Sequence, residues 1–210
     1  YYNAQKFFRQ AEQARQEQER QTALWGKGGR RSARHPAGSA GDLYDKAARR
    51  AAKVLEQHRD SELVDDAMFL MGRALYWQGD YLNALRAFRD VESSFPTSVF
   101  FDRARYWQAL CLEAQSLTGE ARSVYRSLVT AGRGEVAYQS GYRLGEMTFA
   151  RGEYLQAIEE YQATLGAFPR APNRAELWLR LGEAAMALED TARHQQALEA
   201  FAQVLREHPS

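Results

Sequence analysis

The chain has 210 residues, of which 45% are hydrophobic and 26% charged, and its formal net charge is +1. This hydrophobic share is sufficient for a buried core, and the near-neutral charge gives no reason to expect nucleic acid as a partner. No run approaches the ~20 apolar residues that a membrane-spanning helix needs. Cys111 is the only cysteine, which excludes an internal disulfide.

The first predicted helix covers residues 3–25. A stripe of apolar side chains at helical spacing begins it, formed by Ala4, Phe7, Phe8, Ala11 and Ala14. The stripe predicts packing against the rest of the molecule. Residues 15–21 are wholly polar, so this end of the helix is expected to project into water.

A glycine-rich insertion at 26–41, GKGGRRSARHPAGSAG, separates this helix from a second one predicted over 42–58. The insertion has no large apolar side chain and cannot bury enough surface to offset the entropy lost on ordering, so a flexible loop is predicted. Its basic residues are Lys27, Arg30, Arg31 and Arg34. Each would contribute ~1 kcal/mol near an anionic lipid surface. Contact with lipid headgroups, docking onto a protein, and a simply solvated loop all remain open.

An alanine recurs along the whole chain at a nearly constant interval. The positions are Ala47, Ala84, Ala121, Ala157 and Ala197, and the steps between them are 37, 37, 36 and 40 residues. A fixed period of ~20–50 residues is typical of repeat architectures. In such a solenoid each repeat buries its hydrophobic face on its neighbour and leaves a long surface for partners.

Each alanine after the first has the same surroundings. A small residue stands 12 to 15 positions before it, at Gly72, Ala109, Gly145 and Gly182. An aromatic residue follows one helical turn after it, at Phe88, Tyr125, Tyr161 and Phe201. Prolines that cannot continue a helix close three repeats, at Pro96, Pro169 and Pro209, and Gly132 and Gly134 are expected to make the remaining turn. The predicted later repeats are 62–96, 98–133, 134–169 and 172–209.

This pattern of small residue, alanine, aromatic and proline resembles the tetratricopeptide repeat (TPR) family. The best-matching phrases are MFLMGRALYWQGDYLNALRAFRDVESSFP (68–96) and YRLGEMTFARGEYLQAIEEYQATLGAFP (142–169). The resemblance covers essentially all of residues 1–210. It implies an all-α, right-handed superhelical solenoid of about five helix pairs, and a non-catalytic scaffold that binds other proteins.

The opening segment YYNAQKFFRQAEQA resembles the region after the lipid-bearing cysteine of bacterial TPR lipoproteins. Two envelope families are similar: the TPR lipoprotein of the β-barrel assembly machinery and the periplasmic TPR protein of the Tol–Pal system. They imply a periplasmic, membrane-tethered scaffold for envelope complexes. Alternatives are a permanent extrinsic subunit that stabilises a large membrane complex, for example a bioenergetic one, and a peptidoglycan- or carbohydrate-binding module.

The resemblance also indicates where a partner binds, because the first helix of each TPR pair lines the concave groove. Positions near the small residues then predict a partner-binding face made of Phe69, Arg73, Tyr76, Tyr106, Glu113, Tyr142, Glu146, Phe149, Leu179 and Glu183. Aromatic side chains provide contact area at low entropic cost. The alternative is that several of these rings complete the core between helices.

The last predicted helix carries apolar residues that cannot all face inward without a neighbour: Leu198, Phe201, Val204 and Leu205. Terminal repeats need a polar outer face, so another subunit or further residues are expected to cover this end.

No arrangement of residues predicts catalysis. The histidines His35, His58, His194 and His208 are scattered, and neither metal-ligand spacing nor a nucleophile motif is present. No catalytic residue, cofactor or metal is predicted.

Overall fold

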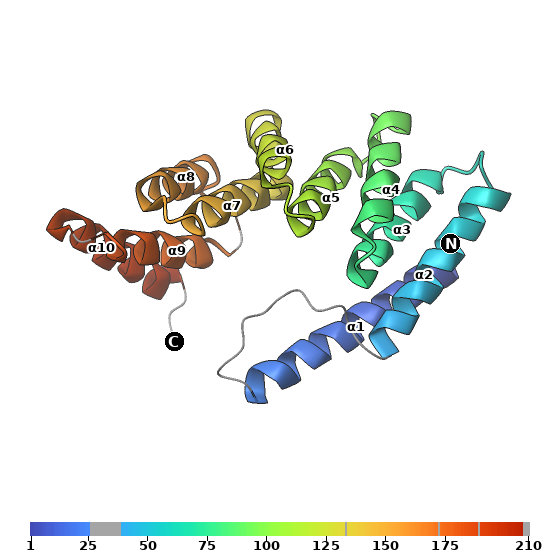
Figure 1. Cartoon of the computed structure of the whole chain (residues 1–210), viewed down its shortest axis with the longest axis horizontal. Coiled ribbons are helices and arrows are strands. Elements are labelled where there is room, and N and C mark those ends of the chain that lie inside the picture. The colour runs from blue at the N-terminus through green and yellow to red at the C-terminus, as the bar shows by residue number, and fades with distance from the viewer. Residues whose placement is uncertain (26–38, 133, 172, 189, 208–210) are drawn as a thin grey trace. The chain divides into compact units, whose positions relative to one another are not determined.

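The computed structural model describes residues 1–25, 39–132, 134–171, 173–188 and 190–207. Within these ranges the regular secondary structure consists of ten α-helices and no strand (Figure 1), which confirms the predicted all-α class. The chain divides into two compact units, Tyr1–Thr118 and Gly119–Ser210. The continuous array predicted over 1–210 is therefore described as unit 1 and unit 2, each by itself.

Unit 1 contains five helices, each packed on the next. They are α1 (Tyr2–Trp25), α2 (Ser39–Gln57), α3 (Val64–Gln78), α4 (Tyr81–Ser94) and α5 (Phe101–Ala114). Helix α3 also contacts both α1 and α5. These alternate helices therefore form one layer, and we call α1, α3 and α5 the inner helices of unit 1.

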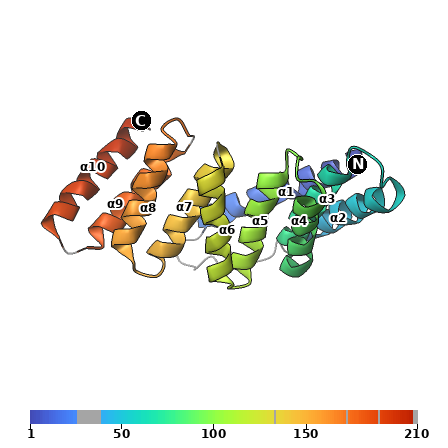
Figure 2. The same cartoon turned by 90° about the horizontal axis from the view of Figure 1, so that it is seen from above.

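Unit 2 begins at Gly119, within α6 (Thr118–Ala131), and continues with α7 (Glu135–Phe149), α8 (Tyr154–Ala167), α9 (Arg174–Met186) and α10 (Thr191–Glu207). Figure 2 shows α7, α8, α9 and α10 side by side, and each packs on the next. By their place in the repeat, α7 and α9 are the inner helices of this unit.

The recurring small residues make room for the recurring aromatic rings. A Cβ atom placed on Gly72 would lie 2.7 Å from a ring carbon of Phe88, and one on Gly145 would lie 2.2 Å from a ring carbon of Tyr161. Gly182 stands in the same relation to Phe201, at 2.4 Å. Phe201 was expected at an exposed end. It packs inward against the core instead, because Gly182 leaves space for its ring.

The turn between α3 and α4 shows why the repeat needs particular residues between its helices. Gly79 has a φ of 81°, in the left-handed region where a residue without Cβ is favoured. Asp80 then accepts a hydrogen bond from the backbone N–H of Asn83 at 3.2 Å and caps α4. In unit 2 the equivalent Gly152 has a φ of 76°, but Glu153 makes no such side-chain cap.

One sequence-based boundary of the first repeat is wrong. Helix α2 begins at Ser39, so the last three residues of the predicted loop 26–41 are helical, and Ala40 is buried. The polar segment 15–21 was expected in water; residues 16–20 are exposed as expected, whereas Arg15 is half-buried and its guanidinium lies 4.2 Å from the ring centroid of Trp77. Lys27, Arg30, Arg31 and Arg34 lie outside the described residues, so the loop and its basic cluster remain predictions.

Candidate protein-binding site

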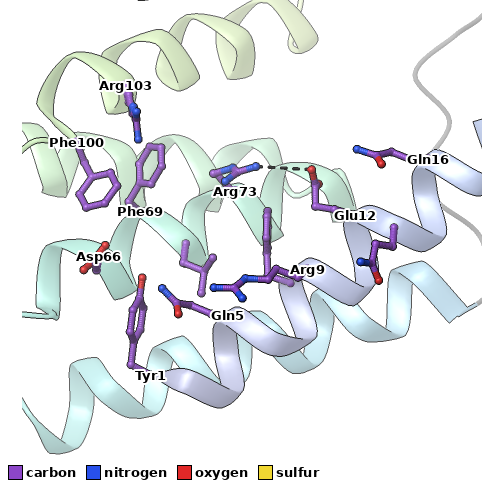
Figure 3. Close-up of a pocket in the computed structure, with 13 residues that line it drawn as sticks. Tyr1, Gln5, Arg9, Glu12, Gln16, Asp66, Phe69, Arg73, Phe100 and Arg103 are labelled. Atoms are coloured by element: carbon purple, nitrogen blue, oxygen red, sulfur yellow. Dashed lines mark ion pairs between the residues drawn. The ribbon is translucent and has the colours of Figure 1, made fainter.

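The inner helices of unit 1 enclose a hollow of about 490 Å³ (Figure 3). Helix α1 supplies one wall, α3 the other, and the start of α5 closes one end. The lining residues are Tyr1, Gln5, Phe8, Arg9, Glu12, Gln13, Gln16, Asp66, Phe69, Leu70, Arg73, Phe100 and Arg103. Four aromatic rings, three arginines, three glutamines and two carboxylates therefore share one surface, which we call the unit 1 hollow.

Arg73 occupies the centre of the hollow. Its guanidinium carbon lies 4.4 Å from the ring centroid of Phe8 and 5.3 Å from that of Trp107. Burial lowers the pKa of Arg73, and the nearby charge of Glu12 opposes this effect. Its Nε atom is buried and has no hydrogen-bond partner among the described residues. The cation is thus partly removed from water and stabilised mainly by ring faces.

Glu12 joins α1 to both of its neighbouring helices. Its carboxylate accepts a hydrogen bond from the Tyr44 hydroxyl of α2 at 2.6 Å and lies 3.7 Å from a guanidinium nitrogen of Arg73. A guanidinium nitrogen of Arg15 lies at the same distance from the same carboxylate oxygen. Burial, together with the bond to Glu12, raises the pKa of Tyr44, so this tyrosine remains a neutral donor. One carboxylate is thus shared by two arginines.

The rim of the hollow carries two further cations. Arg9 of α1 and Arg103 of α5 are exposed, and neither forms an ion pair within the part of the chain that the structure describes. On the acidic side, Asp66 hydrogen-bonds to the Tyr1 hydroxyl, and burial is the main cause that raises the pKa of its carboxyl. Positive charge therefore exceeds negative charge, and two arginines at the rim are available to a ligand.

The inner helices of unit 2 carry a network of the same type but with the charges paired. Arg180 of α9 lies 3.2 Å from Glu146 of α7 and 2.8 Å from Glu183. Glu146 also accepts a hydrogen bond from the buried Tyr161 at 2.7 Å, and the Tyr142 hydroxyl donates to Glu176 at 2.9 Å. The pKa of Arg180 is raised: burial would lower it, but hydrogen bonds to Tyr142 and Glu183 and the charge of Glu146 outweigh that effect.

The ten predicted partner-binding residues are divided between the two units. In unit 1, only Phe69 and Arg73 line the hollow. Phe69 is a buried core residue, stacked on Phe100 at 4.8 Å between ring centroids. Phe69 therefore lines the hollow although it is only 6% exposed, and its role in partner binding stays a prediction. Tyr76 is half-buried in a cluster with Trp77, Tyr81 and Trp107, and Tyr106 and Glu113 are half-buried on α5.

In unit 2, Tyr142, Glu146 and Glu183 belong to the network around Arg180. Phe149 is half-buried against Tyr154, with 5.2 Å between ring centroids, and Leu179 is exposed. The sequence reasoning did not find Arg9, Glu12, Arg103 or Arg180. Treating residues 2–25 as an inner helix would have pointed to Arg9 and Glu12, which lie beside the apolar stripe.

The described residues contain no group of three or more histidine, cysteine or carboxylate side chains placed to hold a metal ion. None of their helices is both long and apolar enough to cross a membrane.

A helix-pair repeat with a hollow on its inner helices defines the chain as a helical-repeat protein of the binding class. The tetratricopeptide repeat model matches residues 37–99, 69–136 and 142–210, and the chain belongs to this family. Tetratricopeptide repeat proteins generally mediate protein–protein interaction. A search of the curated proteins found no match.

Solved structures share the fold. A crystal structure of MamA has a TM-score of 0.61 at 19% identity and covers 79% of this chain and 89% of that chain. MamA 41-end from Desulfovibrio magneticus RS-1 has a TM-score of 0.54 at 22% identity, with 82% and 99% covered. The nearly identical TPR-like repeats of a putative kinesin light chain from Podosopora anserina reach 0.59 at 17% identity, with 99% of each chain covered. At these identities the likeness establishes the fold alone.

Proposed function

We propose that this chain is a non-catalytic scaffold that holds a partner protein by a segment seated in the unit 1 hollow. The observation that carries the proposal is the excess of cations in an aromatic-lined hollow, with Arg9 and Arg103 unpaired at its rim. A segment with carboxylate side chains beside an apolar or aromatic one fits this surface. The carboxylates would pair with the rim arginines, and the apolar group would pack on the rings.

The hollow is expected to be preformed, so that the partner segment binds with little rearrangement of the helices. Glu12 already fixes α1 against α2 and α3 through Tyr44 and Arg73. A preorganised site loses less entropy on binding. The hollow is open along α1, where Gln5, Gln13 and Gln16 offer amide donors and acceptors to a partner's backbone.

A peptide-binding experiment with a charge-matched control tests the proposal. A labelled library of 15-residue peptides is selected on the wild-type chain, and the best binders are measured by fluorescence anisotropy. We expect them to contain Asp or Glu beside an aromatic residue and to bind more weakly as salt increases. Replacing Arg9→Glu and Arg103→Glu together should weaken them at least about tenfold.

The control replaces two exposed arginines outside the hollow, Arg50→Glu and Arg89→Glu, which changes the net charge equally. Binding should then stay near the wild-type value. Peptides that bind the hollow variant and the control variant equally would show that the hollow is not the site.

We also propose that the scaffold works in the bacterial envelope, tethered to a membrane and acting in the assembly or maintenance of envelope complexes. The support is the resemblance of YYNAQKFFRQAEQA and of the repeat phrases to envelope TPR lipoproteins. Mass spectrometry of the protein purified from its native cells tests this. A lipid-modified cysteine upstream of Tyr1, in a protein recovered with membranes, is expected. An unmodified protein recovered with cytosolic markers would refute it.

A further inference from the structure

The side of unit 2 formed by α9 and α10 exposes four large apolar side chains. Leu179 and Met186 of α9 are 41% and 49% exposed, and Leu198 and Leu205 of α10 are 62% and 73% exposed. In each helix the two residues are seven positions apart, so each pair lies on one face. We call these four residues the α10 end face. It is separate from the unit 1 hollow.

The repeat shows that the equivalent positions are normally covered. When the recurring Ala157 and Ala197 are aligned, Leu198 corresponds to Ile158 and Leu205 corresponds to Leu165. Ile158 is only 2% exposed and Leu165 only 4%, because α9 packs over α8. The α10 end face therefore has the composition of an internal helix–helix contact but no cover among the described residues.

The helix geometry places the α9 residues on the same side. Leu177 and Leu181 belong to the core cluster with Ile158 and Tyr161 of α8, and Gly182 contacts Phe201 of α10. At about 100° per residue, Leu179 and Met186 point away from α8 and past α10. In the preceding repeat the corresponding Tyr142 reaches the next inner helix, where it bonds to Glu176.

Helix α10 is self-complementary across this face. Leu198, Ala202 and Leu205 follow one another at spacings of four and three residues, as in a helix–helix seam. Glu199 and Arg206 flank the seam on the other side. Arg206 has no ion pair within the described residues, and Glu199 only accepts a 3.5 Å hydrogen bond from Gln195.

We propose that a second copy of this chain covers the α10 end face, with the two α10 helices antiparallel about a two-fold axis at Ala202. In this arrangement Leu198 lies opposite Leu205 of the other copy and Glu199 opposite Arg206. The two residues of each pair are offset along the helix axes by about 1.5 Å, which is the rise of one residue. The small Ala202 allows the helix axes to approach closely.

The two-fold axis also places the apolar contacts and the ion pairs on opposite flanks of the helix pair. A dyad perpendicular to both helices keeps each flank of one α10 beside the same flank of the other. Leu198 and Leu205 lie on the flank toward α9, about 50° from Ala202, and Glu199 and Arg206 lie about 50° to the other side. The leucines of both copies therefore gather beside Leu179 and Met186, and the charges form two ion pairs on the far flank. In a parallel pair, the axis would run along the helices and would place the charged flank of each α10 beside the leucine flank of the other, so these ion pairs could not form.

Charge-swap variants test the proposal, with the molar mass measured by sedimentation equilibrium over a range of concentrations. The wild-type chain should form a dimer. Glu199→Arg alone places an arginine opposite Arg206 in both pairs of the dimer, and Arg206→Glu alone places a glutamate opposite Glu199. The dimer dissociation constant of each variant should therefore rise at least about tenfold. An equimolar mixture of these two variants should recover the dimer, because every pair across the dyad then joins opposite charges. The double variant should recover it as well.

Two further variants separate this interface from general adhesion between molecules. Leu198→Glu should give a monomer with unchanged helical circular dichroism. Leu155→Glu, at a leucine of α8 that is 52% exposed, should leave the dimer intact. A wild-type chain that is monomeric at every concentration would overturn the proposal and assign the face to a different protein. Failure of the mixture to recover the dimer would overturn the antiparallel arrangement.

Discussion

The inner helices of the two units carry the same network with different charge balances. In unit 1, Glu12 accepts a hydrogen bond from Tyr44 and lies 3.7 Å from Arg73 of the next inner helix. In unit 2, Glu146 accepts one from Tyr161 and lies 3.2 Å from Arg180 of the next inner helix. Each network links a carboxylate on one inner helix, a tyrosine on the outer helix that follows it, and an arginine on the next inner helix.

The difference lies in what else each arginine meets. Arg180 has a second carboxylate, Glu183, and its pKa is raised. Arg73 shares Glu12 with Arg15 and lies between aromatic rings, and burial lowers its pKa. The unit 2 network is therefore closed and holds helices together. The unit 1 network leaves net positive charge in a hollow, as a binding surface requires.

The largest expected effect concerns equivalent aromatic residues of the two units. Phe88 is fully buried against Phe69 and Trp107, so Phe88→Ala should lower the free energy of unfolding by about 3–5 kcal/mol. Phe201 packs on Gly182 but is partly exposed, so Phe201→Ala should cost about half as much. Urea unfolding measures the losses, and hydrogen exchange by mass spectrometry assigns each to its unit. Equal losses would mean that the terminal repeat is as well packed as the interior of unit 1.

A smaller effect tests the two networks directly. Glu12→Gln keeps an acceptor for Tyr44 but leaves Arg73 without a carboxylate, at an expected cost of about 1–2 kcal/mol. Glu146→Gln should cost less, about 0.5 kcal/mol, because Arg180 keeps Glu183.

Adding Arg73→Met to Glu12→Gln should restore part of the loss, since no buried cation then remains unpaired. The free energies again come from urea unfolding. If Glu146→Gln proves the more costly change, the distinction between an open and a closed network fails.

Alkaline pH should weaken unit 2 through its tyrosines. Burial raises the pKa of Tyr142 to about 12, and the bond to Glu176 acts in the same direction. An unfolded tyrosine titrates near ~10, so between these values the folded state binds more protons. The contribution of Tyr142 to the free energy of unfolding is complete below pH ~10 and is lost as the pH rises toward 12.

Unfolding experiments at pH 9, 10 and 11 measure this loss. Tyr142→Phe should reduce the slope above pH 10, whereas Tyr2→Phe, at an exposed position of α1, should not. A slope that Tyr142→Phe leaves unchanged would assign the alkaline loss to other groups.

The alanine period was sufficient to predict the helix pairs, because each recurring alanine is fully buried where its helix packs on its neighbours. The contacts of Gly145 with Tyr161 and of Gly182 with Phe201 follow the same spacing. The family and the all-α class could therefore be predicted from the sequence, because the contacts that define them lie within one repeat or between adjacent repeats.

The hollow could not be predicted in the same way. Glu12 and Arg73 are far apart in sequence, and their contact depends on how α1 is rotated against α3. Phe69 is an example: it lines the hollow, but it is buried and stacked on Phe100, and the rotation of α3 decides how much of its ring a partner can reach. A spacing pattern fixes which residues share a face but not where that face points.

The smallest expected effect compares equivalent helix starts in the two units. Asp80 caps α4 by accepting from the backbone N–H of Asn83, whereas Glu153 at the start of α8 provides no side-chain cap. Asp80→Ala should therefore destabilise unit 1 by ~1 kcal/mol. Glu153→Asp should stabilise unit 2 by a few tenths of a kcal/mol, because the shorter carboxylate can reach the N–H groups of the first turn. Thermal unfolding of both variants measures the changes. If Glu153→Asp destabilises unit 2, the ion pair that Glu153 forms with Arg151 contributes more to α8 than a cap would.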